Sequence, residues 1–258
     1  MIIESFKILN VPISVTNSQK VFDQISNIYK RNFSQFICVR DVHGLILNSK
    51  NKELFEAHQK SALVVPDGKP IEWIGRILGY KNISQVCGRD LVRIVLSQGK
   101  NRNWRHYFYG GKPGVAEKMV ENLRLEFPNV RIVGFSTPPF GDINDFEIDV
   151  LADELKNSRT DILWIGLSTP KQEIFMQKNK DILQIPLMFG VGAAFDFIAG
   201  TKKVCPIWMQ RLGLEWAFRC LQEPRRLGPR YLRIIPIFIV RIIQEFIKMK
   251  VKTHRRKS

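Results

Sequence analysis

Short apolar runs alternate with longer amphipathic stretches along most of this chain. Apolar runs that end in Gly, Pro or polar residues predict strands, here at 6–13, 36–39, 63–65, 104–109, 130–135, 161–167 and 186–189. The stretches between them predict helices, from about residue 18, over 45–60 and 71–79, from 85 and 115, over 145–157 and from 168. Strands that alternate with helices indicate an α/β fold, in which helices cover both faces of a mostly parallel sheet.

Five of the segments that follow predicted strands are rich in Gly, Pro and polar residues: 40–44, 66–70, 110–114, 168–173 and 190–196. Parallel strands point the same way, so their carboxyl ends meet at one edge of the sheet. The sequence therefore predicts a cleft lined by these five segments.

Asp67 is the residue around which this cleft is expected to be built. The apolar run Leu63-Val64-Val65 leads directly into Pro66-Asp67-Gly68-Lys69-Pro70. Pro-Asp-Gly is ordinary turn chemistry, so a purely structural role is the first alternative. Because the other polar strand ends are expected to converge on the same cleft, a functional role for Asp67 is favoured over a purely structural one.

The remaining strand ends give weaker signals. Asp41 and His43 follow a strand closely, and a ligand role and a structural role are equally plausible for them. The turn at 110–114 suits a phosphate but is not a Walker A loop, and 190–196 has only two glycines of a dinucleotide fingerprint. Asp90 falls in a first helical turn, where it complements the helix dipole.

There is no Asp-x-Asp sequence, no close set of metal ligands and no Gly-x-Ser-x-Gly elbow, which argues against a metal site and a serine hydrolase.

Composition divides the chain into two parts. Among its 258 residues, 45% are apolar, enough for a sizeable core. Residues 201–258 hold 15 Lys/Arg against 3 Asp/Glu, whereas residues 1–200 hold 25 against 21. We therefore expect a body over 1–200 and a basic appendage over 201–258 that meets an anionic partner. The four cysteines are widely spaced, which is typical of reduced thiols in a cytosolic protein.

The appendage contains a helical pattern that is basic on one face and broadly apolar elsewhere, with Pro236 predicted to kink or start the helix. Two alternatives remain: the apolar face lies in an anionic membrane surface, or it packs on the body or on another subunit. The dominance of basic residues on the polar face favours the membrane, and the width of the apolar face argues against nucleic acid. Arg241 interrupts the apolar run, so no transmembrane span is predicted, and no signal peptide is apparent.

An ordered set of short motifs resembles the WecG/TagA/CpsF glycosyltransferase family, from about residue 10 to about residue 232. The motifs are Pro66-Asp67-Gly68, Gly88-x-Asp90-Leu91, Gly110-Gly111-Lys112-Pro113-Gly114, Pro170-Lys171-Gln172-Glu173, Gly190-Val191-Gly192-x-x-Phe195-Asp196, Trp208-Met209-Gln210-x-x-Gly213-Leu214-Glu215-Trp216 and Arg219-x-x-Gln222-Glu223-Pro224-x-Arg226. Each motif is weak alone, but the ordered set is highly specific.

This resemblance implies a Rossmann-like α/β enzyme whose C-terminal appendage completes the site at the membrane. It implies an inverting, metal-independent transfer of a sugar from a UDP-sugar to a polyprenyl-diphosphate-linked acceptor, in teichoic acid or other cell-surface polysaccharide synthesis. No cofactor is implied, and the expected place is the cytoplasmic face of the bacterial membrane, as a peripheral protein. A homo-oligomer is also compatible with the apolar tail.

The resemblance also assigns residue roles. It implies Asp67 as the general base, Gln172 and Asp196 as donor contacts, and Arg219 and Arg226 as partners of the diphosphate, with Arg230 matching less closely. The other substrate-binding candidates are Asp41, His43, Gly68, Asp90, Gly110, Gly111, Lys112, Pro170, Lys171, Gly190 and Gly192.

Two positions depart from the family pattern. Family members often have Thr-x-Asn where this chain has Val39-Arg40-Asp41, and many have an arginine where it has Gln85. Both positions are expected to affect the sugar or the acceptor, so N-acetylmannosamine is not assumed as the donor. The alternative hypothesis is a non-catalytic module that binds a nucleotide sugar or a lipid on the same fold.

Overall fold

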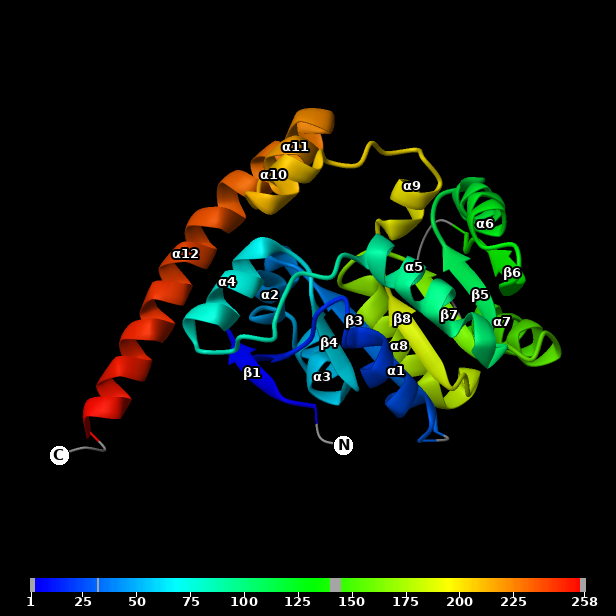
Figure 1. Ribbon diagram of the computed structural model, residues 1–258, viewed down its shortest axis with the longest axis horizontal. Coiled ribbons are helices and arrows are strands. Elements are labelled where there is room, and N and C mark those ends of the chain that lie inside the picture. Colours follow the sequence, from blue (N-terminus) through cyan, green and yellow to red (C-terminus); the bar gives the residue numbers. More distant parts are fainter. Residues whose placement is uncertain (1–2, 32, 140–144, 256–258) are drawn as a thin grey trace.

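A six-stranded parallel sheet forms the centre of the computed structural model, which describes residues 3–31, 33–139 and 145–255 (Figure 1). Its strand order is β4-β3-β8-β7-β5-β6. The strands are β3 (Gln35–Arg40), β4 (Leu63–Pro66), β5 (Arg105–Gly110), β6 (Arg131–Ser136), β7 (Ile162–Gly166) and β8 (Leu187–Gly190). The predicted α/β fold with a mostly parallel sheet is therefore confirmed.

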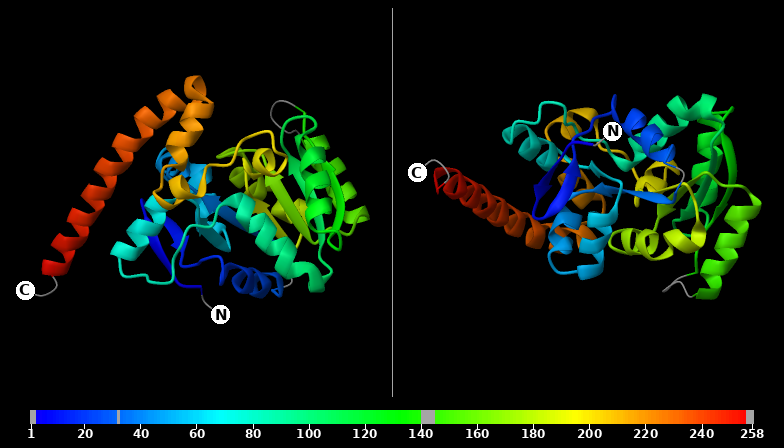
Figure 2. Two further views of the ribbon diagram at one scale, coloured as in Figure 1. Left: turned by 45° about the horizontal axis from the view of Figure 1, so that its top comes forward. Right: turned by 90° about the horizontal axis from the view of Figure 1, so that it is seen from below.

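Two hydrophobic cores lie on opposite faces of this sheet, because successive strand residues point to opposite sides. In β3, Ile37 and Val39 belong to one core, whereas Phe36 and Cys38 belong to the other. The first core is covered by α1 (Val21–Tyr29), α5 (Gly88–Gly99), α6 (Val115–Glu126) and α9 (Ala194–Ile198). The second is covered by α2 (Val42–Asn48), α3 (Lys52–Lys60), α4 (Lys69–Ile77), α7 (Asp145–Asn157) and α8 (Lys171–Leu183) (Figure 2).

Two predicted elements are each divided in the structure. The expected strand at 6–13 is an antiparallel hairpin of β1 (Ser5–Ile8) and β2 (Val11–Ser14). Leu9 and Asn10 turn the chain with positive φ values of 48° and 67°, although neither is a glycine. The expected helix at 45–60 is α2 followed by α3, because Asn51 ends the run and caps α3 by accepting a hydrogen bond from the backbone N–H of Leu54 at 2.9 Å.

The carboxyl ends of the strands lie along one edge of the sheet, as predicted. Arg40 pairs with Pro66 in the register of β3 and β4, and Gly110 pairs with Gly166 in that of β5 and β7. Gly110 has a φ of 127°, and a Cβ added there would lie 2.8 Å from the Gly166 backbone. This close approach requires glycine, so the turn after β5 is fixed by strand packing.

The C-terminal appendage consists of α10 (Ile207–Arg211), α11 (Glu215–Gln222) and the long helix α12 (Pro224–Arg255), which runs beside α4 and α2 in both figures. Pro236 lies inside α12, so of its two predicted roles, a kink or a helix start, the start is wrong. The inner face of α12 is anchored on both sides of that proline, since Ile234 and Phe238 are buried in the second core. Among the described helices, none has the length and apolar character needed to cross a bilayer.

Polar contacts extend this anchoring toward the C-terminus of α12. Arg241 donates to the Ser49 hydroxyl at 2.5 Å, and Glu245 accepts from the backbone N–H of Leu9 at 3.1 Å. Part of the tail helix therefore packs on the body, which is one of the two alternatives that its sequence left open.

Candidate active site

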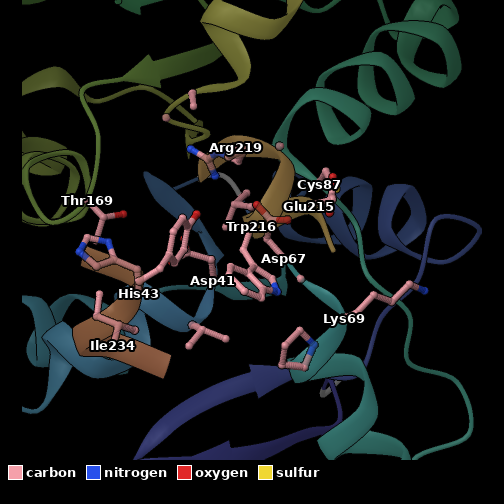
Figure 3. Close-up of a pocket in the computed structure, with 18 of the residues that line it drawn as sticks. Asp41, His43, Asp67, Lys69, Cys87, Thr169, Glu215, Trp216, Arg219 and Ile234 are labelled. Carbon is pink, nitrogen blue, oxygen red and sulfur yellow. The ribbon is translucent and has the colours of Figure 1, made fainter. Parts of the chain in front are cut away.

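A cavity of about 750 Å³ lies between the carboxyl edge of the sheet and the appendage (Figure 3). Predicted site residues that line it are Asp41, His43, Asp67, Gly68, Gly111, Gln172, Gly192, Asp196, Arg219, Arg226 and Arg230. They come from the segments after five strands and from two appendage helices, and the parallel sheet and the docked appendage bring them together.

Asp67 lines this cavity directly after β4. Its backbone N–H donates to the carbonyl of Arg40 at 2.8 Å, and Gly68 then turns the chain into α4 with a φ of 114°. No hydrogen bond or ion pair joins the Asp67 carboxylate to another described residue. Burial, together with the charges of Glu215 and Asp41, raises the pKa of Asp67 to about 7, against the opposing effect of Arg219 and Arg89. A carboxylate with this pKa suits a general base that works near neutral pH.

Asp41 and His43 form a second polar group at the end of β3. Asp41 caps α2 by accepting a hydrogen bond from the Gly44 N–H at 2.8 Å. Burial opposes its ionisation, but Arg40, His43 and that hydrogen bond together lower the pKa of Asp41. Burial and the nearby arginines lower the pKa of His43 to about 4, so its ring is neutral at pH 7 and can donate one hydrogen bond and accept another.

Gln172 presents an amide oxygen in the interior of the site. Its Nε2 donates to Oε1 of Glu173 at 2.9 Å, and Glu173 forms a fully buried ion pair with Arg40. A Cβ at Gly190 would come within 3.1 Å of the Gln172 amide, so glycine makes room for it. The Gln172 Oε1 is buried without a hydrogen-bond partner in the described part of the chain, and it can accept one from a bound ligand.

Arg219, Arg226 and Arg230 line the side of the cavity formed by the appendage. Burial and the charges of Arg219 and Arg226 lower the pKa of Arg230, although Asp41 opposes them. Arg226 is paired with Glu223, while Arg219 lies 5.8 Å from the ring centre of Phe197. Three converging arginines suit a ligand with several negative charges, such as a diphosphate.

Six predicted site residues do not line the cavity. Gly110 and Gly190 make room for neighbouring groups, as described above. Asp90 lies 3.6 Å from Arg89 in an ion pair, with about half of its side chain exposed. The side chains of Lys112 and Lys171 are exposed, and Pro170 precedes the first turn of α8.

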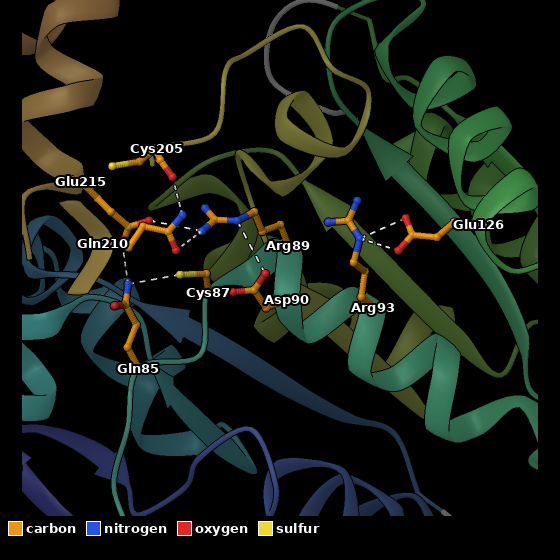
Figure 4. Close-up of polar contacts among 9 residues, drawn as sticks. All are labelled: Gln85, Cys87, Arg89, Asp90, Arg93, Glu126, Cys205, Gln210 and Glu215. Atoms are coloured by element: carbon orange, nitrogen blue, oxygen red, sulfur yellow. Dashed lines mark hydrogen bonds and ion pairs between the residues drawn. The ribbon is translucent and has the colours of Figure 1, made fainter. Parts of the chain in front are cut away.

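Among the charged residues at the site that received no role from the sequence are Glu215 of the appendage and Arg89 of α5. Both line the cavity, and Arg89 donates to Glu215 at 3.3 Å and to the Gln210 side chain at 3.2 Å (Figure 4). Gln85, one of the departures from the family pattern, donates to Glu215 at 2.6 Å. These contacts hold α10 and α11 against the body. Glu215 lies within a recognised motif, but the sequence does not show that it meets Arg89.

Comparisons with known proteins identify the family of the chain. Residues 6–252 match the family described as "Glycosyl transferase WecG/TagA/CpsF family". An N-acetylglucosaminyldiphosphoundecaprenol N-acetyl-beta-D-mannosaminyltransferase of Bacillus subtilis is 26% identical over 196 residues, 76% of this chain and 74% of the relative. A protein of the same description from Bacillus spizizenii is 28% identical over 191 residues, 74% of this chain and 72% of the relative. The match to the family covers nearly the whole chain, which therefore belongs to the WecG/TagA/CpsF family of glycosyltransferases.

Proposed function

We propose that this protein transfers a sugar from a UDP-sugar to N-acetylglucosamine linked through a diphosphate to a polyprenol. The observation that carries the proposal is one cavity lined both by Asp67, with a pKa raised to about 7, and by three arginines of the appendage. The names of the two Bacillus relatives give the acceptor class and make N-acetylmannosamine the first sugar to test.

In the proposed mechanism, Asp67 removes the proton from the attacking hydroxyl of the acceptor. The hydroxyl oxygen bonds to the anomeric carbon of the donor while the bond to the UDP oxygen breaks, so UDP leaves with the bonding electrons. Attack from the face opposite UDP inverts the anomeric configuration. Gln172 and Asp196 are proposed to contact the donor, and Asp41 and neutral His43 to contact sugar hydroxyls.

The arginines are proposed to stabilise the charged groups without a metal ion. Arg219, Arg226 and Arg230 all line the cavity, and we propose that together they donate charge-assisted hydrogen bonds to both diphosphates, that of UDP and that of the acceptor. In the described part of the chain, no group of three or more His, Cys, Asp or Glu side chains is arranged to hold a metal ion. Turnover in the presence of EDTA tests this part of the proposal.

The two departures from the family pattern act differently in this proposal. Val39 lines the cavity, and we propose that it contacts the substrate. Gln85 is outside the cavity lining and acts through its hydrogen bonds to Glu215 and, at 3.1 Å, to the Cys87 sulfur. Donor choice is therefore expected to depend mainly on Val39 and Asp41.

The two parts of the chain have different roles in this proposal. We propose that the body, residues 1–200, holds the donor and the base, and that the appendage, residues 201–258, supplies the arginines and contacts the membrane. The apolar residues of α12 that face solvent support this, because Leu232, Val240 and Ile247 are all more than half exposed. Peripheral binding at the cytoplasmic face is consistent with a nucleotide-sugar donor and a lipid acceptor.

The test is UDP release by the purified chain with a panel of UDP-hexoses and a polyprenyl-diphosphate-linked N-acetylglucosamine acceptor. We expect release with one donor, and loss of turnover in Asp67→Asn while UDP still binds. Retained turnover in that variant would refute the role of Asp67 as base. Binding of UDP-sugar without any turnover would favour the alternative of a non-catalytic binding module.

A further inference from the structure

The cavity has an apolar half, formed by α4 on one side and α12 on the other. It begins beside the arginines and continues along α12 toward the C-terminus. Its lining residues are Trp73, Ile74, Ile77, Ile234, Ile235, Phe238, Ile239, Ile242, Ile243 and Phe246. Packing in the second core accounts for Ile74, Ile234 and Phe238. It does not account for Trp73, Ile77, Ile239 and Ile243, and neither the base nor the arginines require them.

The outer rim of this apolar half is exposed to solvent. The exposed fractions are 46% for Trp73 and 71% for Ile77 on α4, and 51% for Ile239 and 53% for Ile243 on α12. These four residues also line the cavity, so its apolar half opens outward between the two helices. Exposed apolar residues that border a cavity indicate a binding site for an apolar ligand or a membrane.

The order of side chains along α12 matches one class of molecule. Arg226 and Arg230 come first, and the apolar lining residues follow from Ile234 to Phe246. At 1.5 Å per residue, Arg230 and Ile243 are about 20 Å apart along the helix. A polyprenyl diphosphate has the same order, with an anionic diphosphate followed by a branched hydrocarbon chain.

We infer that the groove between α4 and α12 binds the first isoprene units of the acceptor, and that the chain leaves it past Trp73, Ile77, Ile239 and Ile243 into the membrane. This inference rests on the proposed function, because it assumes that the arginines hold the acceptor diphosphate. The apolar half is continuous with the arginine-lined half, so a molecule that fills both must carry its charge and its hydrocarbon in this order. An acceptor bound in this way is held at two points, and its sugar is fixed in front of Asp67.

Neighbouring residues of α12 provide a matched test. Ile239 and Val240 are 51% and 53% exposed, but only Ile239 lines the cavity. We would measure kcat/KM with a long-chain polyprenyl acceptor and with a short-chain acceptor of the same head group. Ile239→Ser and Ile77→Ser should lower kcat/KM about tenfold for the long chain and much less for the short chain, since a lost apolar contact is worth about 1–3 kcal/mol. With both acceptors in detergent micelles, so that no contact with a bilayer contributes, Val240→Ser and Leu232→Ser should leave the ratio of the two values as in the wild type.

A binding measurement decides the inference even if no acceptor is turned over. A polyprenyl diphosphate with a photoreactive diazirine on an early isoprene unit is cross-linked to the full chain in vesicles, and the labelled peptides are identified. Labels on α4 and on the cavity-lining residues of α12 would support binding of the prenyl chain in the groove, provided that Ile239→Ser reduces the labelling and Val240→Ser does not. In that case, failure of turnover counts against the proposed function alone.

Three results would overturn the inference. Labels confined to outward residues such as Val240 would show that the prenyl chain stays outside the groove. Equal losses in Ile239→Ser and Val240→Ser would assign the effect to general membrane adhesion. Loss of labelling when phosphatidylglycerol is added in excess would assign the groove to a phospholipid.

Discussion

Replacing Asp67 by asparagine should stabilise the folded protein while it removes turnover. Burial and two nearby carboxylates raise the pKa of Asp67 from its ordinary value of 3.8 to about 7. The folded chain therefore keeps this proton between about pH 4 and pH 7, whereas the unfolded chain releases it. Stability falls as the pH rises through that window, because ionising Asp67 is harder in the folded state.

The size of the effect follows from that pKa difference. Each pKa unit corresponds to about 1.4 kcal/mol, so ionised Asp67 costs at most about 4 kcal/mol above pH 7. Asp67 borders an open cavity where water screens charges, so we expect roughly half of this, about 2 kcal/mol. For a chain of this size, that corresponds to a rise in melting temperature of about 4–8 °C.

The assay is urea denaturation of the wild type and Asp67→Asn at pH 5, 6, 7 and 8. The stability gain of the variant should grow from pH 5 to pH 7 and then level off. Asp181→Asn is the matched control, because its side chain is 84% exposed and lies outside the cavity, and it should show no such trend. If the variant is no more stable than the wild type at pH 8, ionised Asp67 does not destabilise the folded protein and the reasoning is refuted.

Three further predictions concern the groups around Asp67. The kcat/KM of the wild type should fall about tenfold per pH unit below pH 7, since the base must be ionised, and a flat profile from pH 5.5 to 8 would contradict this. Glu215→Gln removes a negative charge that raises the pKa of Asp67, so the same profile should move to lower pH; an unchanged profile would show that Glu215 acts only in docking the appendage. Arg40→Leu leaves the Glu173 carboxylate buried without its ion-pair partner and should lower the free energy of unfolding by about 3–5 kcal/mol. Adding Glu173→Gln to that variant should recover part of the loss, as measured by urea denaturation.

Most of the fold could be predicted from the sequence, because each parallel strand is a short apolar run bounded by turn residues. The hairpin was missed, since Leu9 and Asn10 turn the chain without glycine or proline. The break after α2 was missed for a related reason: Asn51 caps α3 within a stretch whose apolar spacing continues across the gap.

The candidate site was only partly predictable. Residues at strand ends could be grouped because parallel strands finish at one edge, and eleven of the predicted residues line one cavity. The contact between Arg89 and Glu215 joins positions 126 residues apart, and no local pattern reveals it. The faces of α12 were also hidden, because an apolar residue that packs on the body looks the same in sequence as one that lines a cavity.

The alternation of side chains at the end of β3 has a consequence for how such enzymes diverge. Val39 and Asp41 reach the cavity, whereas the intervening Arg40 is fully buried and paired with Glu173 from α8. The two outer positions can therefore change with the sugar that is selected, while position 40 is tied to a residue 133 positions away. Across related proteins, we expect residues 40 and 173 to be kept or replaced together, and positions 39 and 41 to vary independently of them.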